Sequence, residues 1–224
     1  MTSNLSSKGE IKMEPMLFKT GTTTLGIACK DGIVLAADKK MTLGGQIVSS
    51  TKMEKVLILN EELAFTVAGN VSDIQLLVKI IKAQIKLEEL RKGKKIKVKE
   101  SANLLASLVY NNIRKYSTIP GITAFLFAGK DSEGFHLYQL GVDGSISKYD
   151  DYVTDGSGMM FATGALEAGY TKDVNVEEAI KLAVKAVSAS MQRDTASGGG
   201  IDVVTITKDG TKRVMTKQLE SKLT

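Results

Sequence analysis

The sequence predicts an α+β protein with four layers, in which two antiparallel sheets are stacked face to face and a pair of helices covers each outer side. Strand-like and helical runs follow one another in blocks: strands, two helices, strands, two helices, strands. Short polar turns rich in Asp-Gly separate neighbouring strands, and such turns connect antiparallel strands. Each sheet in this arrangement buries one face against the other sheet and the second face under helices.

Short strands dominate the first third of the chain. Residues 22–29 and 33–38 form two β-type runs on either side of Asp31-Gly32, which predicts a hairpin. A second pair of runs covers residues 55–59 and 63–68, with a polar turn between them. We therefore expect this region to contribute strands to the sheets and no helix.

Helical periodicity begins after these strands. Apolar residues recur at helical spacing from Ile74 to Ile85, and Asn70 or Ser72 is available to cap this helix. The next helix runs through Leu104–Val109 and must end before Pro120, because the residue before a proline disfavours helical dihedrals. Further strands are expected at 122–128, 135–140, 146–149, 201–207 and 213–216, and further helices at 159–170 and 176–193.

Composition excludes several classes of protein. The chain has 224 residues, of which 43% are hydrophobic and 25% charged, and it shows no internal repeat or linker, so one domain is expected over residues 22–224. The net charge of +5 is spread along the chain, and the basic run 91–97 is interpreted as a solvated loop, so nucleic-acid binding is not expected. No apolar segment reaches the roughly 18 residues of a membrane span. The single cysteine, Cys29, excludes an intrachain disulfide and favours a reducing, cytoplasmic location.

The usual catalytic arrangements are missing from the sequence. His136 is the only histidine and lies in an alternating strand, where a structural role is expected, which disfavours a Ser-His-Asp triad. Ser157 lacks the spacing of a nucleophile elbow, and the glycines at 198–200 lack the Lys-Ser/Thr of a phosphate loop. With one His and one Cys, a structural zinc site is not expected.

A different chemistry is available at Gly21-Thr22-Thr23-Thr24. A hydroxyl is a poor nucleophile until a base takes its proton, and a free α-amino group has a pKa of about 7.7–8.0. A threonine that becomes N-terminal therefore carries the nucleophile and the base in one residue. Taken alone, however, the triplet is better explained as β-branched strand sequence.

Several further segments favour the catalytic interpretation. They are Thr22–Ile27 with Ala36–Asp38, Thr66–Gly69, Asp155–Gly158 and, most specifically, Arg193–Gly199. Together they resemble the catalytic β-type subunits of proteasomes, of the archaeal kind, in the order of that family and over about residues 21 to 220. The N-terminal-nucleophile hydrolase fold of that family is the four-layer sandwich predicted above.

The resemblance implies a threonine endopeptidase with Thr22 as its nucleophile. Amide hydrolysis by a side-chain hydroxyl would need neither a metal nor an organic cofactor, and none is expected. The leader, residues 1–21, would be removed when the Thr22 hydroxyl attacks the Gly21 carbonyl. Asp38 would hold a lysine ammonium near Thr22, and Gly69 would contribute its backbone N–H to an oxyanion hole. Three more residues match those that hydrogen-bond and position the Thr22 amine: Ser157, Asp194 and Ser197.

The lysine has to be chosen between two candidates, because the segment after Asp38 is one residue longer than is usual in the family. The distance from Lys55 to Gly69 is the family's distance, which places the extra residue in the turn at 44–46. Lys55 is therefore the predicted residue and Lys52 the alternative. Its role would be electrostatic, lowering the cost of negative charge at the Thr22 hydroxyl.

The resemblance also implies a substrate pocket and partners. Met41, Met53 and Val67 match positions that line the pocket for the side chain preceding the cut, and all three are apolar. The implied partners are other β subunits in a seven-membered ring, α-type subunits and a regulatory ATPase, and the implied substrates are unfolded polypeptides inside a chamber.

Two other functions are compatible with parts of the sequence. A non-catalytic β-type ring subunit is disfavoured because Thr22, Asp38 and Lys55 are all present. A different N-terminal-nucleophile amidohydrolase acting on small amides is disfavoured by the segment Arg193–Gly199.

Overall fold

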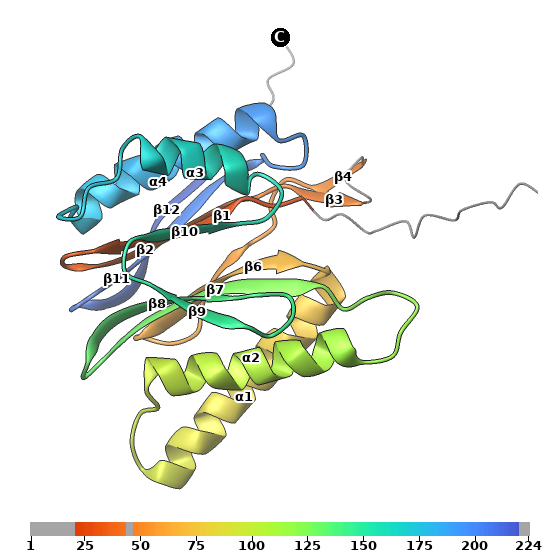
Figure 1. The fold of residues 1–224 in the computed structure, drawn as a ribbon, viewed down its shortest axis with the longest axis vertical. Helices are drawn as coiled ribbons and strands as arrows, with labels where there is room; N and C mark the ends of the chain where they lie inside the picture. Colours follow the sequence, from red (N-terminus) through yellow and green to blue (C-terminus); the bar gives the residue numbers. More distant parts are fainter. Residues whose placement is uncertain (1–20, 44–46, 220–224) are drawn as a thin grey trace, which may run out of the picture.

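The structure, a computed structural model, describes residues 21–43 and 47–219 (Figure 1). In this part of the chain two five-stranded antiparallel sheets lie face to face, with strand orders β10-β1-β2-β11-β12 and β5-β6-β7-β8-β9. Helices α3 and α4 cover the outer face of the first sheet, and α1 and α2 cover that of the second. The predicted four-layer α+β sandwich is thereby confirmed.

The elements follow the predicted blocks. The strands are β1 (Thr24–Cys29), β2 (Gly32–Asp38), β3 (Met41–Leu43), β4 (Ile47–Ser50), β5 (Val56–Ile58), β6 (Leu63–Gly69), β7 (Thr123–Asp131), β8 (Gly134–Leu140), β9 (Ile146–Tyr149), β10 (Tyr152–Asp155), β11 (Gly200–Thr207) and β12 (Gly210–Gln218). The helices are α1 (Val71–Lys92), α2 (Val98–Arg114), α3 (Met159–Glu167) and α4 (Val176–Arg193). No helix in these residues is long and apolar enough to cross a membrane.

Strand β2 shows why the first sheet is buried on both faces. Its residues alternate between two apolar clusters, with Ile33 and Leu35 between the sheets and Val34 and Ala36 under the helices. All of its residues are buried. Because side chains of a strand alternate between the two faces of the sheet, a near-continuous apolar run suits a strand that is covered on both sides.

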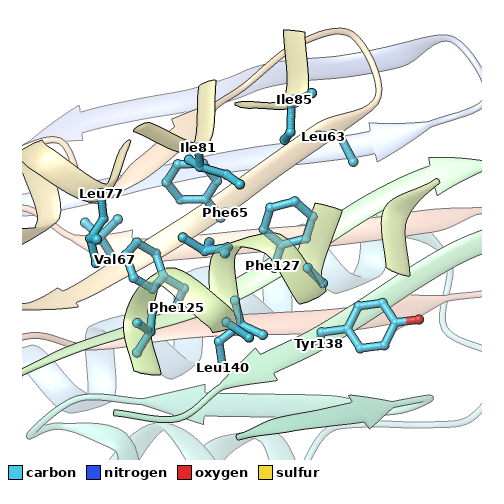
Figure 2. Close-up of a cluster of buried hydrophobic side chains, with 14 of the residues drawn as sticks. Leu63, Phe65, Val67, Leu77, Ile81, Ile85, Phe125, Phe127, Tyr138 and Leu140 are labelled. Carbon is cyan, nitrogen blue, oxygen red and sulfur yellow. The ribbon is translucent and has the colours of Figure 1, made fainter. Parts of the chain in front are cut away.

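The second sheet packs on α1 and α2 through a cluster of aromatic and aliphatic side chains (Figure 2). Phe65 of β6 lies at its centre, with its ring centroid 5.7 Å from that of Phe125 and 6.1 Å from that of Phe127. Ile81 of α1 closes over these rings and is completely buried. Full burial of each such side chain contributes roughly 1.5–3 kcal/mol, and this cluster therefore fixes β6 and β7 firmly.

The structure corrects the predicted elements in a few places. The helix expected at 159–170 ends at Glu167, because the chain turns at Gly169, whose N–H bonds to the Leu166 carbonyl oxygen at 3.0 Å. Asn70 does occupy the N-cap position of α1, but its side chain donates to the Pro120 carbonyl oxygen at 2.7 Å and does not cap the helix. Strands β3, β4 and β10 were not predicted, because they are short and, in β4, largely exposed. The turn at 44–46 and the leader up to residue 20 lie outside the described residues.

Candidate active site

The candidate site forms where several strands end together at one edge of the sandwich. Thr22 and Thr23 immediately precede β1, and Asp38 is the last residue of β2. The antiparallel register pairs Thr24 with Ala37, and the Asp38 N–H bonds to the Thr23 carbonyl oxygen at 3.1 Å. The hairpin predicted from the turn at Asp31-Gly32 therefore brings the start of β1 next to the end of β2.

The peptide bond between Gly21 and Thr22 is held firmly on both sides. The Thr22 hydroxyl donates to the Gly21 carbonyl oxygen at 2.6 Å, and the Gly21 N–H donates to the Thr42 hydroxyl at 3.1 Å. A Cβ atom at Gly21 would lie 1.7 Å from the Cβ of Ala196, so no larger residue fits there without movement. Thr22 itself is only 3% exposed.

Lys55 is the lysine that reaches this bond. Its ammonium lies 2.8 Å from Asp38 Oδ1 and 3.1 Å from the Gly21 carbonyl oxygen, and its side chain is buried. Burial lowers the pKa of Lys55 below its ordinary value of 10.5, while the neighbouring Asp38 carboxylate acts in the opposite direction. Lys52, the alternative, is exposed on the surface.

The Asp38 carboxylate is fixed by four donors. Its Oδ1 accepts from Lys55 and from the Thr23 N–H at 2.9 Å, and its Oδ2 accepts from the N–H groups of Lys40 at 3.0 Å and Gly198 at 2.9 Å. Hydrogen bonds to a charged carboxylate are stronger than neutral ones. The side chain therefore cannot turn away from Lys55 without losing several of them.

The three residues expected around the Thr22 nitrogen form one chain of hydrogen bonds. The Thr22 N–H donates to the Ser157 hydroxyl at 3.2 Å, and Ser157 donates to Asp194 Oδ2 at 2.6 Å. Ser197 donates to the same Asp194 oxygen at 2.6 Å. Because a hydroxyl has one proton, Thr23 must then donate in its 2.7 Å contact with Ser197. Ser157 thus contacts the nitrogen directly, and Asp194 and Ser197 act through it or through Thr23.

A pocket opens beside Thr22. Gly69, at the end of β6, has a φ of 117°, and a Cβ there would lie 2.1 Å from the Ile122 carbonyl oxygen, so glycine is required. The pocket contains the three predicted apolar residues together with others from neighbouring elements: Gly21, Thr22, Lys40, Met41, Met53, Lys55, Val67, Ala68, Gly69, Val71 and Ile74. Met41, Met53 and Val67 therefore lie in the same pocket as Thr22, and their role in binding substrate stays a prediction.

Sequence reasoning missed two residues of the site. Thr42 binds the Gly21 N–H, and Lys40 lines the pocket while its ammonium donates to the Thr195 carbonyl oxygen at 3.1 Å. Their position within a few residues of Asp38 was the only available signal. Neither residue belongs to a sequence motif that would have indicated a role.

The remaining candidate side chains lie elsewhere. The His136 Nε2 is 3.1 Å from Asp131 Oδ1, at the end of β7 opposite to the strand end that pairs with Gly69. Asp131, Glu133 and His136 are close enough together to hold a metal, but Asp131 already accepts from two backbone N–H groups and Glu133 pairs with Lys97. Burial raises the pKa of the Cys29 thiol to about 12, so it is not a thiolate at neutral pH.

Comparison with known proteins agrees with this geometry. Residues 18–206 match the model of the family described as proteasome subunit. The proteasome subunit beta of Archaeoglobus fulgidus is 40% identical over 197 residues, which cover 88% of this chain and 90% of the relative. The proteasome subunit beta of Archaeoglobus profundus is 42% identical over 190 residues (85% and 86%), and the proteasome subunit beta 1 of Thermococcus onnurineus is 39% identical over 203 residues (91% and 97%).

The sandwich with its site at the start of β1 defines the class of N-terminal-nucleophile hydrolases. Within that class, the chain belongs to the proteasome subunit family. It is a peptidase subunit of the proteasome core, a hydrolase of the threonine type, as the sequence predicted, and it assembles into a proteasome with other subunits. The alternatives of a non-catalytic ring subunit and of a different N-terminal-nucleophile amidohydrolase acting on small amides are therefore set aside.

Proposed function

We propose that this chain is made as a precursor that cuts itself between Gly21 and Thr22 and then hydrolyses peptide bonds with Thr22 as the nucleophile. One observation carries the proposal: the Thr22 hydroxyl and the Lys55 ammonium both contact the Gly21 carbonyl oxygen, at 2.6 and 3.1 Å. A nucleophile and a positive charge are thus held at the same carbonyl group, which is what acyl transfer needs.

In the self-cleavage step, the Thr22 oxygen attacks the Gly21 carbonyl carbon and the negative charge develops on the carbonyl oxygen. The Lys55 ammonium stabilises this charge, and Asp38 keeps the ammonium in place. The C–N bond then breaks as the departing nitrogen takes up the proton that the Thr22 hydroxyl has lost, leaving residues 1–21 attached to Thr22 as an ester and freeing the Thr22 amine. Water hydrolyses the ester and releases the leader.

In the hydrolysis of substrates, the freed amine takes the proton of the Thr22 hydroxyl, as its pKa near neutrality allows. Ser157 and Asp194 orient the nitrogen, and Ser197 supports Asp194 through its own hydrogen bond. The substrate carbonyl oxygen lies toward the Gly69 backbone N–H in the oxyanion hole. An acyl-enzyme forms on Thr22, and water releases it.

The substrate pocket and the assembly complete the proposal. The side chain preceding the cut enters the pocket formed by Met41, Met53 and Val67, which favours apolar residues. The chain works in the cytoplasm within a seven-membered β ring that is flanked by α-type subunits and supplied with unfolded polypeptides by a regulatory ATPase. The resemblance of residues 21 to 220 to archaeal β subunits supports these partners.

The experiment is acid quenching of the assembled, processed protein during turnover of a peptide ester, followed by digestion and mass spectrometry. The acyl group should be found on the peptide that begins at Thr22. Acylation of Ser157 or Ser197 in its place would contradict the assignment of the nucleophile. A Thr22→Ser variant, which keeps a hydroxyl, is the matched control and should still be acylated at position 22.

A further inference from the structure

A second ionic cluster involves chain neighbours of Asp38 and Lys55 and has no part in the chemistry proposed above. The Asp202 carboxylate, on β11, is completely buried. Its Oδ2 is 2.8 Å from the Lys39 ammonium and 3.1 Å from the Arg213 guanidinium. Arg213 also pairs with Glu54 and donates to the Val56 carbonyl oxygen at 2.9 Å.

The connections of this cluster lead to both members of the proposed catalytic pair. Arg213 binds the residue before Lys55 and the residue after it, and so holds Lys55 from both sides along the chain. Lys39 follows Asp38 directly, and its own carbonyl oxygen accepts from the Met53 N–H at 2.9 Å. Arg213 and Lys39 both contact the same oxygen of Asp202, Oδ2.

The backbone is shaped to bring these side chains together. In the β11–β12 pair, Val203 faces Met215 and Val204 faces Arg213, with a register shift between them. Cross-strand partners share a face, and Val204 packs between the sheets whereas Val203 packs under the helices. The irregularity therefore turns Arg213 toward the space between the sheets, where Asp202 lies; bulges commonly redirect a side chain in this way.

We propose that Asp202 and Arg213 are positioning residues that set the separation of Asp38 and Lys55. The inference rests on the proposed roles of those two residues. Buried charges are costly unless they are paired, so a merely stabilising cluster would be expected to tolerate any replacement that keeps the charges balanced. A positioning cluster requires, in addition, the planar fork of arginine, which can hold several acceptors in a fixed geometry and which lysine lacks.

The test compares Arg213→Gln, Arg213→Lys and Asp202→Asn in the proteasome assembled with its α-type subunits. Lys212→Gln is the matched control, because it removes one positive charge from the neighbouring, exposed position of the same strand. The measurements are kcat and KM for a fluorogenic peptide, the pH–rate profile and the thermal midpoint of each particle.

All three test variants should lower kcat by about tenfold to a hundredfold, the effect of a small displacement in an active site, with little change in KM. The alkaline limb of the pH–rate profile should move to lower pH, because burial continues to lower the pKa of Lys55 while the contact with Asp38, which raises this pKa, is lost. In Arg213→Gln the direct electrostatic effect of removing the cation would raise the pKa of Lys55, which is the opposite direction, so in this variant the direction of the shift separates the two causes.

A normal kcat in Arg213→Lys would overturn the proposal. So would test variants that only yield fewer active particles and leave the pH–rate profile unchanged, since the cluster would then stabilise the protein without positioning the pair. If Asp202→Asn fails to assemble, the two Arg213 variants decide the question. Lys55→Ala serves as the reference: an active Lys55→Ala particle would refute the proposed function itself, whereas an inactive one beside a normal Arg213→Gln particle would refute only the positioning role.

Discussion

Lys55 and Asp38 form a buried ion pair with 2.8 Å between Nζ and Oδ1, although 17 residues separate them in the sequence. The same ammonium lies 3.1 Å from the carbonyl oxygen of Gly21. A charge that is paired on one side and directed at a carbonyl group on the other is placed to stabilise an oxyanion.

Lys55→Ala should reduce peptide hydrolysis by at least about 10²-fold, the usual cost of losing one preorganised group that stabilises transition-state charge. Lys52→Ala, which removes an exposed lysine from the same segment, should keep most activity. The measurement is kcat/KM for a fluorogenic peptide. Loss of activity in Lys52→Ala with retention in Lys55→Ala would show that the lysine was assigned wrongly.

The pH dependence of hydrolysis should carry the signature of Lys55. Burial lowers the pKa of this lysine below its ordinary value of 10.5, and the proposed role needs its charged form. Activity should therefore be present below the lowered pKa and be lost as the pH rises through it, earlier than for an exposed lysine. A profile that stays flat up to pH 10.5 in an intact particle would argue against a charged Lys55.

Gly21→Ala should slow self-cleavage strongly. The added methyl group would meet the Ala196 side chain at 1.7 Å and its backbone at 2.6 and 2.7 Å, so the bond to be cut must shift away from Thr22 and Lys55. The double variant Gly21→Ala with Ala196→Gly should recover little of the cleavage rate, because the contacts with the backbone at position 196 remain. Processing is followed by gel electrophoresis over time; unchanged kinetics in Gly21→Ala would mean that the fit at this position is unimportant.

Cleavage should be preferred after large apolar residues. Burial of such a side chain among Met41, Met53 and Val67 contributes roughly 1.5–3 kcal/mol, which corresponds to tenfold or more over a charged residue. A basic residue should be the least favoured at this position, because Lys40 and Lys55 both line the same pocket. Fluorogenic peptides that differ only at this residue provide the measurement, and equal or faster cleavage after Asp or Arg would contradict the prediction.

Much of the fold could be predicted because its core strands have strong patterns. The apolar run of β2 and the helical stripe of α4 gave bounds that the structure matches almost to the residue. Strand β4 could not be found in this way, because its side chains are mostly exposed and show no alternation toward a core. Strand β10 is only four residues long and follows β9 after a short turn, yet it pairs with β1 in the other sheet.

Only part of the candidate site could be predicted from the sequence. Spacing to Gly69 was sufficient to choose Lys55, whose side chain the fold buries, over Lys52, which it leaves exposed. The roles of Thr42 and Arg213 could not be predicted, because they arise from contacts between residues far apart in the chain. Arg213, for example, pairs with Glu54, which lies 159 positions earlier in the chain. The direction of the Arg213 side chain depends on an irregularity in the strand pairing that no feature of the sequence indicates.

The most direct test of the central claim is the intact mass of the subunit after assembly with its α-type partners. The wild-type chain should lose residues 1–21, since the Thr22 hydroxyl is held 2.6 Å from the Gly21 carbonyl oxygen. Thr22→Ala should retain them and should be inactive toward peptides. A Thr22→Ala chain that begins at position 22 would contradict self-cleavage, and one that also hydrolyses peptides would contradict the assignment of Thr22 as the nucleophile.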